Sequence, residues 1–267
     1  MLKTPVQQVA RWFGYEFSKI SKEVSPVELQ DYPCIDLLDM VMQHYVKTKP
    51  DVFFVQIGAH DGVSADPSSR QIRKYPNWHG ILVEPQPPSF QQLLANYQNE
   101  SRFIFEQVAI GTQDATIPFY TVTDEIADLT FWLPQSASFD REHVRNSLYY
   151  WKHVKKVDAI PDDLDSVIQV LQIPTLTMNS LLHKHQVEWV DLLSLATPGF
   201  DFDLIQLFPF DRMKPPVICF EYLTMLPSKR EACLRFLADR GYGVSRFASR
   251  AVAALDAPKI EWTIGDY

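Results

Sequence analysis

Two apolar runs in the first third of the chain each end in residues that could bind a ligand. Residues 52–57 lead into a loop bounded by Gly58 and Gly62, and residues 80–83 end at Glu84. Short apolar runs that stop abruptly in this way are typical of buried parallel strands. Glycine lets the backbone turn sharply and a ligand approach it, and an acid after the second strand accepts hydrogen bonds from ribose hydroxyls. The pattern therefore predicts a ligand that contains a ribose.

The glycine loop differs from the phosphate-binding motifs of α/β proteins. Three residues separate Gly58 from Gly62, so Gly-x-Gly-x-x-Gly is absent, and no Lys-Ser or Lys-Thr pair follows as in a P-loop. A ligand with a ribose but no pyrophosphate, such as S-adenosylmethionine, suits such a loop. The alternative for the loop alone is an ordinary strand and turn without a ligand, and the position of Glu84 favours the ligand.

Further short motifs follow these two along the chain in a set order. They are residues 55–62 (Val-Gln-Ile-Gly-Ala-His-Asp-Gly), 78–87 (Trp-His-Gly-Ile-Leu-Val-Glu-Pro-Gln-Pro), 108–111 (Val-Ala-Ile-Gly), 177–182 (Thr-Met-Asn-Ser-Leu-Leu), 190–193 (Val-Asp-Leu-Leu), 199–205 (Gly-Phe-Asp-Phe-Asp-Leu-Ile) and 214–221 (Lys-Pro-Pro-Val-Ile-Cys-Phe-Glu). The series resembles the FkbM family of methyltransferases over roughly residues 52–242. The resemblance implies a class I methyltransferase (Rossmann-like) fold and S-adenosylmethionine as methyl donor. It also implies O-methylation, often in natural-product or glycan pathways.

In open α/β sheets the ligand lies beyond the carboxyl ends of the strands. We therefore expect cofactor-binding residues at four strand ends. They are Gln56, Gly58, Ala59, His60, Asp61 and Gly62 after the first strand, Glu84, Pro85 and Gln86 after the second, Gln107, Val108 and Ala109 after the third, near the adenine, and Leu195 and Ala196 at the fourth. The fourth strand should face the methyl group and the acceptor.

At the fourth strand the chain departs from the family pattern. Relatives usually carry Ile-Asp-x-Glu-Gly, whereas residues 195–199 are Leu-Ala-Thr-Pro-Gly, so Ala196 and Pro198 stand in place of two acids. Tyr222 also replaces a frequent His, and Ser249-Arg250 a frequent Asp-Thr. Two carboxylates at a strand end could bind a metal or take a proton, and alanine and proline can do neither. We expect no metal site and a metal-independent reaction.

If methyl transfer persists, another group must remove the proton of the acceptor. His143 and His153 are the first candidates, because they lie in an aromatic-rich insertion and imidazole titrates near neutral pH. Other candidates are His60, Asp201, Asp203 and Glu221, each with a structural role as the alternative.

Two other classes of protein are compatible with parts of the pattern. One is a methyltransferase-fold protein that keeps the cofactor pocket without methylating, as a pseudoenzyme, a scaffold subunit or a repurposed natural-product enzyme such as a cyclase. Ala196 and Pro198 favour it. The other is a nicotinamide oxidoreductase, which the missing Gly-x-Gly-x-x-Gly disfavours.

Composition indicates an ordinary globular chain. With 267 residues and 46% hydrophobic residues, it can form one α/β domain with additions. We expect a helical extension over residues 1–50 and a methyltransferase domain over 51–267 with an insertion at about 124–174. The net charge of −8 argues against nucleic acid or an anionic membrane as partner. A small-molecule acceptor, a possible homodimer and a cytoplasmic location are the remaining expectations.

The order of elements predicts a doubly wound, mostly parallel seven-stranded sheet with an antiparallel C-terminal hairpin. Helices are expected within 6–17, at 37–45, at 67–74, at 90–97 with Ser89 as N-cap, at 201–208 and from 227 to a stop at Gly241. Strands are expected at 52–57, 80–83, 103–110, 116–122 (an edge strand in a hairpin), 187–195, 216–221, 242–247, 251–255 and 260–264.

Overall fold

The computed structural model describes residues 36–64, 68–247 and 249–255. The helix expected within 6–17 and the strand expected at 260–264 lie outside these ranges. The second expected helix is α2 (Leu37–Tyr45), which begins at its N-cap Asp36, whose side chain accepts a hydrogen bond from the backbone N–H of Asp39 at 3.0 Å.

Seven strands form the main sheet, in the order β3-β2-β1-β7-β8-β10-β9. They are β1 (Phe53–Ile57), β2 (His79–Val83), β3 (Phe103–Glu106), β7 (Leu192–Leu195), β8 (Val217–Glu221), β9 (Gly243–Phe247) and β10 (Arg250–Ala254). The pairings β1–β2, β2–β3, β1–β7 and β7–β8 are parallel, and β10 is antiparallel to both β8 and β9. This order confirms the doubly wound, mostly parallel sheet, and it places β1 in the interior as predicted.

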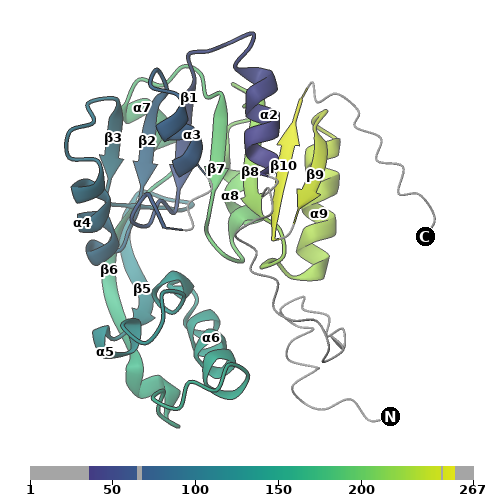
Figure 1. The fold of residues 1–267 in the computed structure, drawn as a ribbon. Helices are drawn as coiled ribbons and strands as arrows, with labels where there is room; N and C mark the ends of the chain where they lie inside the picture. Colours follow the sequence, from purple (N-terminus) through teal and green to yellow (C-terminus); the bar gives the residue numbers. More distant parts are fainter. Residues whose placement is uncertain (1–35, 65–67, 248, 256–267) are drawn as a thin grey trace, which may run out of the picture.

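Helices cover both faces of the main sheet (Figure 1). One hydrophobic cluster joins α7 (Met178–Lys184), α8 (Asp201–Leu207) and α9 (Pro227–Ala238) to one face, and a second joins α2, α3 (Ser69–Lys74) and α4 (Pro87–Asn96) to the other. Side chains alternate between the clusters along each strand, as Val55 and Phe54 do in β1. Within the described residues, no helix has the length and apolar character needed to cross a membrane.

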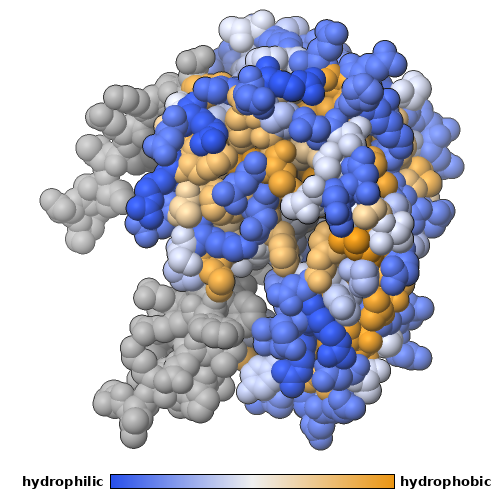
Figure 2. Space-filling view, turned by 180° about the vertical axis from the view of Figure 1, so that it is seen from behind, coloured by the Kyte–Doolittle hydropathy of each residue, from blue (hydrophilic) through white to orange (hydrophobic). Residues whose placement is uncertain are grey.

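A smaller substructure lies next to the carboxyl ends of the parallel strands, below the main sheet in Figure 1. It runs from β5 (Ala115–Val122) to β6 (Ile168–Leu176), and we call residues 115–176 the insertion lobe. Between these strands lie α5 (Asp124–Ala127), η2 (Pro134–Ser136), α6 (Arg141–His153) and η3 (Leu164–Val167). The lobe has a separate hydrophobic cluster that includes Val122, Leu148 and Ile160. Seen from behind, hydrophobic surface gathers along the junction between the lobe and the main body (Figure 2).

Two strand predictions need correction. The run 103–110 is not one strand, because the chain leaves the main sheet after Glu106. Ala109 and Ile110 form β4, which pairs with β6 in a three-stranded sheet of order β4-β6-β5. β5 is an edge strand as expected, yet its partner is β6 rather than a neighbouring hairpin strand. The whole of residues 123–167 separates the two strands.

Two element boundaries also differ from the expectation. α4 begins at Pro87 with Gln86 as N-cap, because proline is well suited to the first turn of a helix, and Ser89 is buried inside the helix. The fourth parallel strand begins at Leu192 rather than at residue 187. The residues before it bring Asp191 into a buried polar cluster.

Asp191 ties the amino ends of β1 and β7 to α2. Its carboxylate is 1% exposed and accepts hydrogen bonds from the Tyr45 hydroxyl at 2.7 Å, the Lys49 ammonium at 2.5 Å, the Phe53 N–H at 2.9 Å and the Trp189 indole at 2.8 Å. Four donors around one buried acid make this the polar anchor of the sheet at the end opposite the carboxyl ends of the parallel strands.

Asp191→Ala should lower the free energy of unfolding by about 2–5 kcal/mol, because the substitution leaves several donors without their acceptor. Urea unfolding of the purified protein measures this change. Glu231→Ala is the control, since its exposed carboxylate pairs only with Arg235 at 3.4 Å and should contribute little. A loss for Asp191→Ala no larger than that of the control would contradict the anchoring role.

Candidate active site

A cavity of about 850 Å³ lies at the carboxyl ends of β1, β2, β7 and β8. Its walls on this side are the residues that directly follow these strands, and its opposite wall comes from β5, η2 and α6 of the insertion lobe. Small-molecule sites occupy roughly 300–1,000 Å³, so this volume lies near the upper end of the range. The cavity therefore has the position expected for a ligand site in an open α/β sheet.

Most of the expected cofactor-binding residues reach this cavity. Those that line it are Gly58, Ala59, His60, Glu84, Pro85, Gln86, Val108, Ala109 and Ala196. Those that do not are Gln56, Asp61, Gly62, Gln107 and Leu195. Gln56 and Leu195 are fully buried within their strands.

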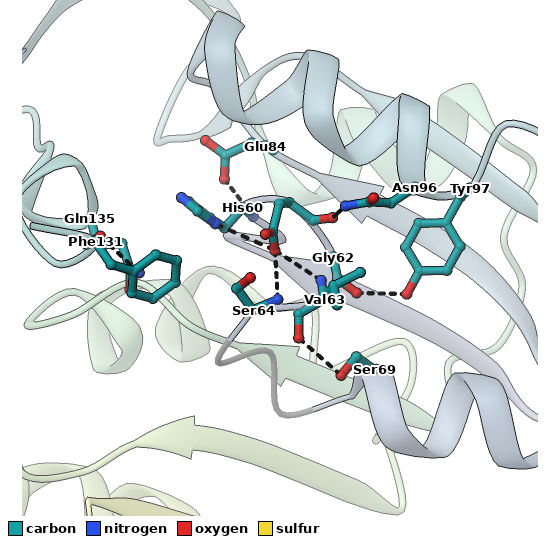
Figure 3. Close-up of polar contacts among 11 residues, drawn as sticks. His60, Gly62, Val63, Ser64, Ser69, Glu84, Asn96, Tyr97, Phe131 and Gln135 are labelled. Atoms are coloured by element: carbon teal, nitrogen blue, oxygen red, sulfur yellow. Dashed lines mark hydrogen bonds and ion pairs between the residues drawn. The ribbon is translucent and has the colours of Figure 1, made fainter. Parts of the chain in front are cut away.

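Asp61 and Gly62 stabilise the glycine loop from within (Figure 3). The Asp61 carboxylate accepts hydrogen bonds from the N–H groups of Val63 at 2.9 Å and Ser64 at 2.7 Å. The Gly62 carbonyl accepts one from the Tyr97 hydroxyl at 2.6 Å. A Cβ on Gly62 would lie 2.5 Å from side-chain atoms of Leu93 and Tyr97. Packing against the side chains of Leu93 and Tyr97 is therefore one structural reason for glycine at position 62.

Close packing also explains why residue 58 is a glycine. Its φ is +79°, and a Cβ there would lie 2.4 Å from the backbone oxygen of Ala196. The glycine permits the loops after β1 and β7 to meet, which brings the ends of these neighbouring strands to one wall of the cavity.

Glu84 is the most deeply buried acid of this wall, at 3% exposure. Its carboxylate accepts hydrogen bonds from the N–H groups of His60 and Gln86, each at 2.9 Å. Burial raises the pKa of Glu84 to about 7, although the N–H groups of Gln86 and His60 and the side chain of Gln86 act in the opposite direction. A carboxylate has about four lone-pair sites, so two further donors can bind it. Glu84 can therefore receive both hydroxyls of a ribose from the cavity side.

The end of β7 carries no acid on the cavity wall, where Ala196, Thr197 and Pro198 stand. Asp201 lies behind them, fully buried, and it does not act as the helix cap that was its alternative role. Its carboxylate instead accepts hydrogen bonds from the N–H and hydroxyl of Thr197 and, at 2.5 Å, from the N–H of Glu221. Burial raises the pKa of Asp201 to about 7. Asp201 thus joins the loop after β7 to the end of β8.

The two histidines of the insertion have different environments. His143 lines the cavity from α6, with its ring 5.4 Å from that of Phe200 between centroids. Burial lowers the pKa of His143, so the imidazole is neutral at pH 7 and can accept a proton. His153 is exposed at the end of α6, and its ring lies 4.4 Å from that of Tyr149 between centroids, tilted by 46°. It lies outside the cavity lining. The structure therefore brings only His143 together with the cofactor-side residues.

One face of α6 supplies much of the wall opposite the main sheet. His143, Ser147, Tyr150 and Trp151 face the cavity, whereas Val144 and Leu148 are buried in the core of the lobe. The spacing of three, four and seven residues places the first set on one side of a helix. The sequence indicated an aromatic-rich insertion here but could not assign these faces.

Two charged pairs complete the lining. Glu221 accepts from the Arg250 guanidinium at 3.0 Å, and Asp203 from the Lys229 ammonium at 2.5 Å. Burial raises the pKa of Glu221, and Arg250 opposes this rise. The sequence indicated both acids as candidates, but it missed Arg250 as the partner of Glu221, which only the antiparallel register of β8 and β10 reveals. In the part of the chain that the structure describes, no three His, Cys, Asp or Glu side chains are grouped to hold a metal ion.

The variant Asp201→Asn tests whether burial raises the pKa of the Asp201 carboxyl group. The pKa in the fold, about 7, exceeds the ordinary 3.8, so the stability that Asp201 contributes is fully present below about pH 4 and is lost as the pH rises through 7. The variant does not titrate there. Its stability relative to the wild type should therefore improve by roughly 1–3 kcal/mol between about pH 5 and pH 8, whatever its starting value. Chemical denaturation at several pH values measures this, and a difference independent of pH would contradict a raised pKa.

Several solved methyltransferase structures are similar to this chain at low identity. A precorrin-6y C5,15-methyltransferase from Geobacter metallireducens has 12% identity and a TM-score of 0.40, covering 81% of this chain and 87% of that one. The METTL16 methyltransferase domain has 9% identity and a TM-score of 0.42, covering 84% and 70%. Aeropyrum pernix fibrillarin, with natively bound S-adenosyl-L-methionine, has 11% identity and a TM-score of 0.35, covering 76% and 65%. At these TM-scores the likenesses carry no functional argument.

Curated proteins give no match to the chain. The model of a protein family, the methyltransferase FkbM domain, matches residues 56–244. This span begins in β1, ends in β9 and includes the glycine loop, Glu84, the insertion lobe and the end of β8. The chain therefore belongs to the FkbM methyltransferase family.

Proposed function

We propose that this protein is an S-adenosylmethionine-dependent O-methyltransferase that acts, without a metal ion, on a small-molecule acceptor of the kind found in natural-product pathways. The observation that carries the proposal is a single cavity that reaches from Glu84 at the end of β2 to His143 on α6. A buried carboxylate that suits a ribose and a neutral imidazole that suits a hydroxyl thus share one site.

The residues on the main-sheet side fit the cofactor. Glu84 is buried, lines the cavity and keeps two acceptor positions for ribose hydroxyls. Val108 and Ala109, after β3, offer an apolar wall for an adenine, and Gly58 and Ala59 form the turn beside it. No pyrophosphate cradle is present in this loop, which agrees with a ligand that lacks one.

S-adenosylmethionine, when bound, supplies an electrophilic methyl group. The chain must then hold the acceptor in line with that methyl group, keep water away and take the hydroxyl proton. The aromatic wall of α6, with Tyr150 and Trp151, excludes water from the acceptor side. His143 is our candidate for the base, because it is neutral at pH 7 and faces the same cavity as Glu84.

Metal independence is the part of the proposal that rests on the end of β7. Ala196 and Pro198 stand where the family usually has two acids, and both line the cavity. The acids that do face the cavity nearby, Asp203 and Glu221, are each paired with a cation of the chain. Divalent ions such as Mg²⁺ and Ca²⁺ need several oxygen ligands, usually with a carboxylate among them.

A second function is favoured by the same two substitutions. The protein could bind the cofactor without transferring its methyl group, as a pseudoenzyme, a scaffold subunit or an enzyme with another reaction. Thermal-shift measurements with S-adenosylmethionine, S-adenosylhomocysteine or a nicotinamide cofactor, each added alone, separate the classes, because a ligand stabilises the fold by RT ln(1 + [L]/Kd). Stabilisation by the nicotinamide cofactor alone would refute the proposal.

Glu84→Ala should weaken S-adenosylmethionine binding about ten- to hundredfold, since it removes charge-assisted bonds worth about 1.5–3 kcal/mol. Because the pKa of Glu84 is about 7, wild-type affinity should also fall as the pH drops below 7, and that dependence should vanish in the variant. Calorimetry measures both effects. Equal affinity of a folded variant and the wild type would count against a ribose contact.

His143→Ala should reduce methyl transfer by about 10²- to 10⁴-fold, the usual contribution of a general base, with little change in cofactor affinity. Release of S-adenosylhomocysteine across a panel of hydroxylated acceptors measures turnover. His153→Ala is the matched control, because His153 lies on the same helix outside the cavity. Activity that a chelator abolishes and Mg²⁺ restores would refute metal independence, and binding without turnover in the wild type would favour the second function.

A further inference from the structure

Gln86 links the main sheet to the insertion lobe by both ends of its side-chain amide. The amide nitrogen donates to the Pro134 carbonyl in η2 at 3.1 Å, and the amide oxygen accepts from the Thr121 hydroxyl in β5 at 3.1 Å. The backbone N–H of the same residue donates to Glu84 at 2.9 Å. One residue therefore contacts the acid of the cofactor side and two elements of the opposite wall.

A second link runs from Glu84 to the same part of the lobe. Glu84 also accepts from the N–H of His60, whose ring lies edge-on to Phe131 at 5.3 Å between centroids, close to η2 (Figure 3). His60 has a φ of 49°, a left-handed conformation that is unfavourable for a residue with a Cβ. The Glu84 carboxylate thus binds the backbone N–H groups of His60 and Gln86. The side chains of these two residues contact Phe131 and Pro134 of the lobe.

The lobe has a hydrophobic core of its own around Val122, Leu148 and Ile160. A small second cluster of Ala109, Phe119 and Ile173 joins β4 to β5 and β6. Packing therefore fixes the shape of the lobe and attaches its two strands, but no residue of η2 belongs to any of these clusters, so the position of η2 over the cavity depends on other contacts. Polar contacts with defined geometry can set that position.

We infer that Gln86 is a positioning residue, which holds β5 and η2 over the cavity and couples the wall they form to hydrogen bonding at Glu84. When a ligand donates to Glu84, the turn that carries Gln86 is held more firmly, and so is the wall that faces the acceptor. Coupling of this kind is reciprocal, so a well-placed wall also favours the ligand at Glu84. The coupling, though not the positioning, rests on the proposed function.

Amide hydrogen exchange of the full-length chain measures how often this wall of the cavity opens. The N–H groups of Ser136, Ala137 and Ser138 donate to Leu133, Pro134 and Tyr120 at 3.1, 3.2 and 2.9 Å, so their exchange reports opening of η2 and of its bridge to β5. Gln86→Leu, which keeps the volume and removes both hydrogen bonds, should speed exchange of these amides about tenfold without ligand.

Gln169→Leu is the matched control. The Gln169 amide donates to the Val122 carbonyl at 2.8 Å, from β6 to β5 inside the lobe, so its loss should not release η2 from the main sheet. Thr121→Val removes the other partner of Gln86. The double variant Gln86→Leu, Thr121→Val should show less loss of protection than the sum of the single variants, because the two residues share one hydrogen bond.

Exchange measured with saturating S-adenosylhomocysteine tests whether ligand binding at Glu84 is coupled to the wall, beyond the positioning role of Gln86. In the wild type the ligand should slow exchange of the three amides at least about threefold, and in Gln86→Leu it should not. Unchanged exchange in Gln86→Leu without ligand would overturn the positioning role. Equal slowing by the ligand in both proteins would overturn the coupling. Failure of the ligand to bind the wild type would overturn the proposed function and the coupling together, and the comparison without ligand would still decide the positioning role.

Discussion

The site depends on one buried carboxylate that holds two backbone N–H groups. Glu84 ends β2, and its oxygens fix the loop after β1 through His60 and the turn before α4 through Gln86. Burial makes ionisation of this acid costly, which its raised pKa records. A buried acceptor with unused lone pairs favours a ligand that brings hydroxyl donors, which is the physical basis of the ribose contact proposed for Glu84.

At the end of β7 an acid lies behind the cavity wall and not on it. The cavity wall has Ala196 and Pro198, while Asp201 lies behind the wall and binds the backbone of Thr197 and Glu221. Asp201 therefore shapes the loop without reaching the cavity. The acid–base candidates that line the cavity are His60, His143, Asp203 and Glu221.

The cavity lies between the main sheet and the insertion lobe, which supply opposite walls. The lobe has a separate core, and α6 presents one face to that core and another to the cavity. Gln86, in the turn that Glu84 holds, donates to η2 and accepts from β5, and the His60 ring of the other loop contacts Phe131. A wall with its own core can keep its shape while its distance from the sheet changes, which suits a site that must admit an acceptor and then exclude water.

The sequence by itself determined the doubly wound sheet, the position of β1, Glu84 as the acid of the second strand and the departure at Ala196 and Pro198, because these depend on local runs and their order. Tertiary structure decided what depends on register and on distant packing. It paired Glu221 with Arg250, split the run 103–110 between two sheets, gave Gly62 a packing role and placed His143, not His153, in the cavity. Two histidines ten residues apart on one helix face different sides, and only the partners of α6 decide which side is the cavity.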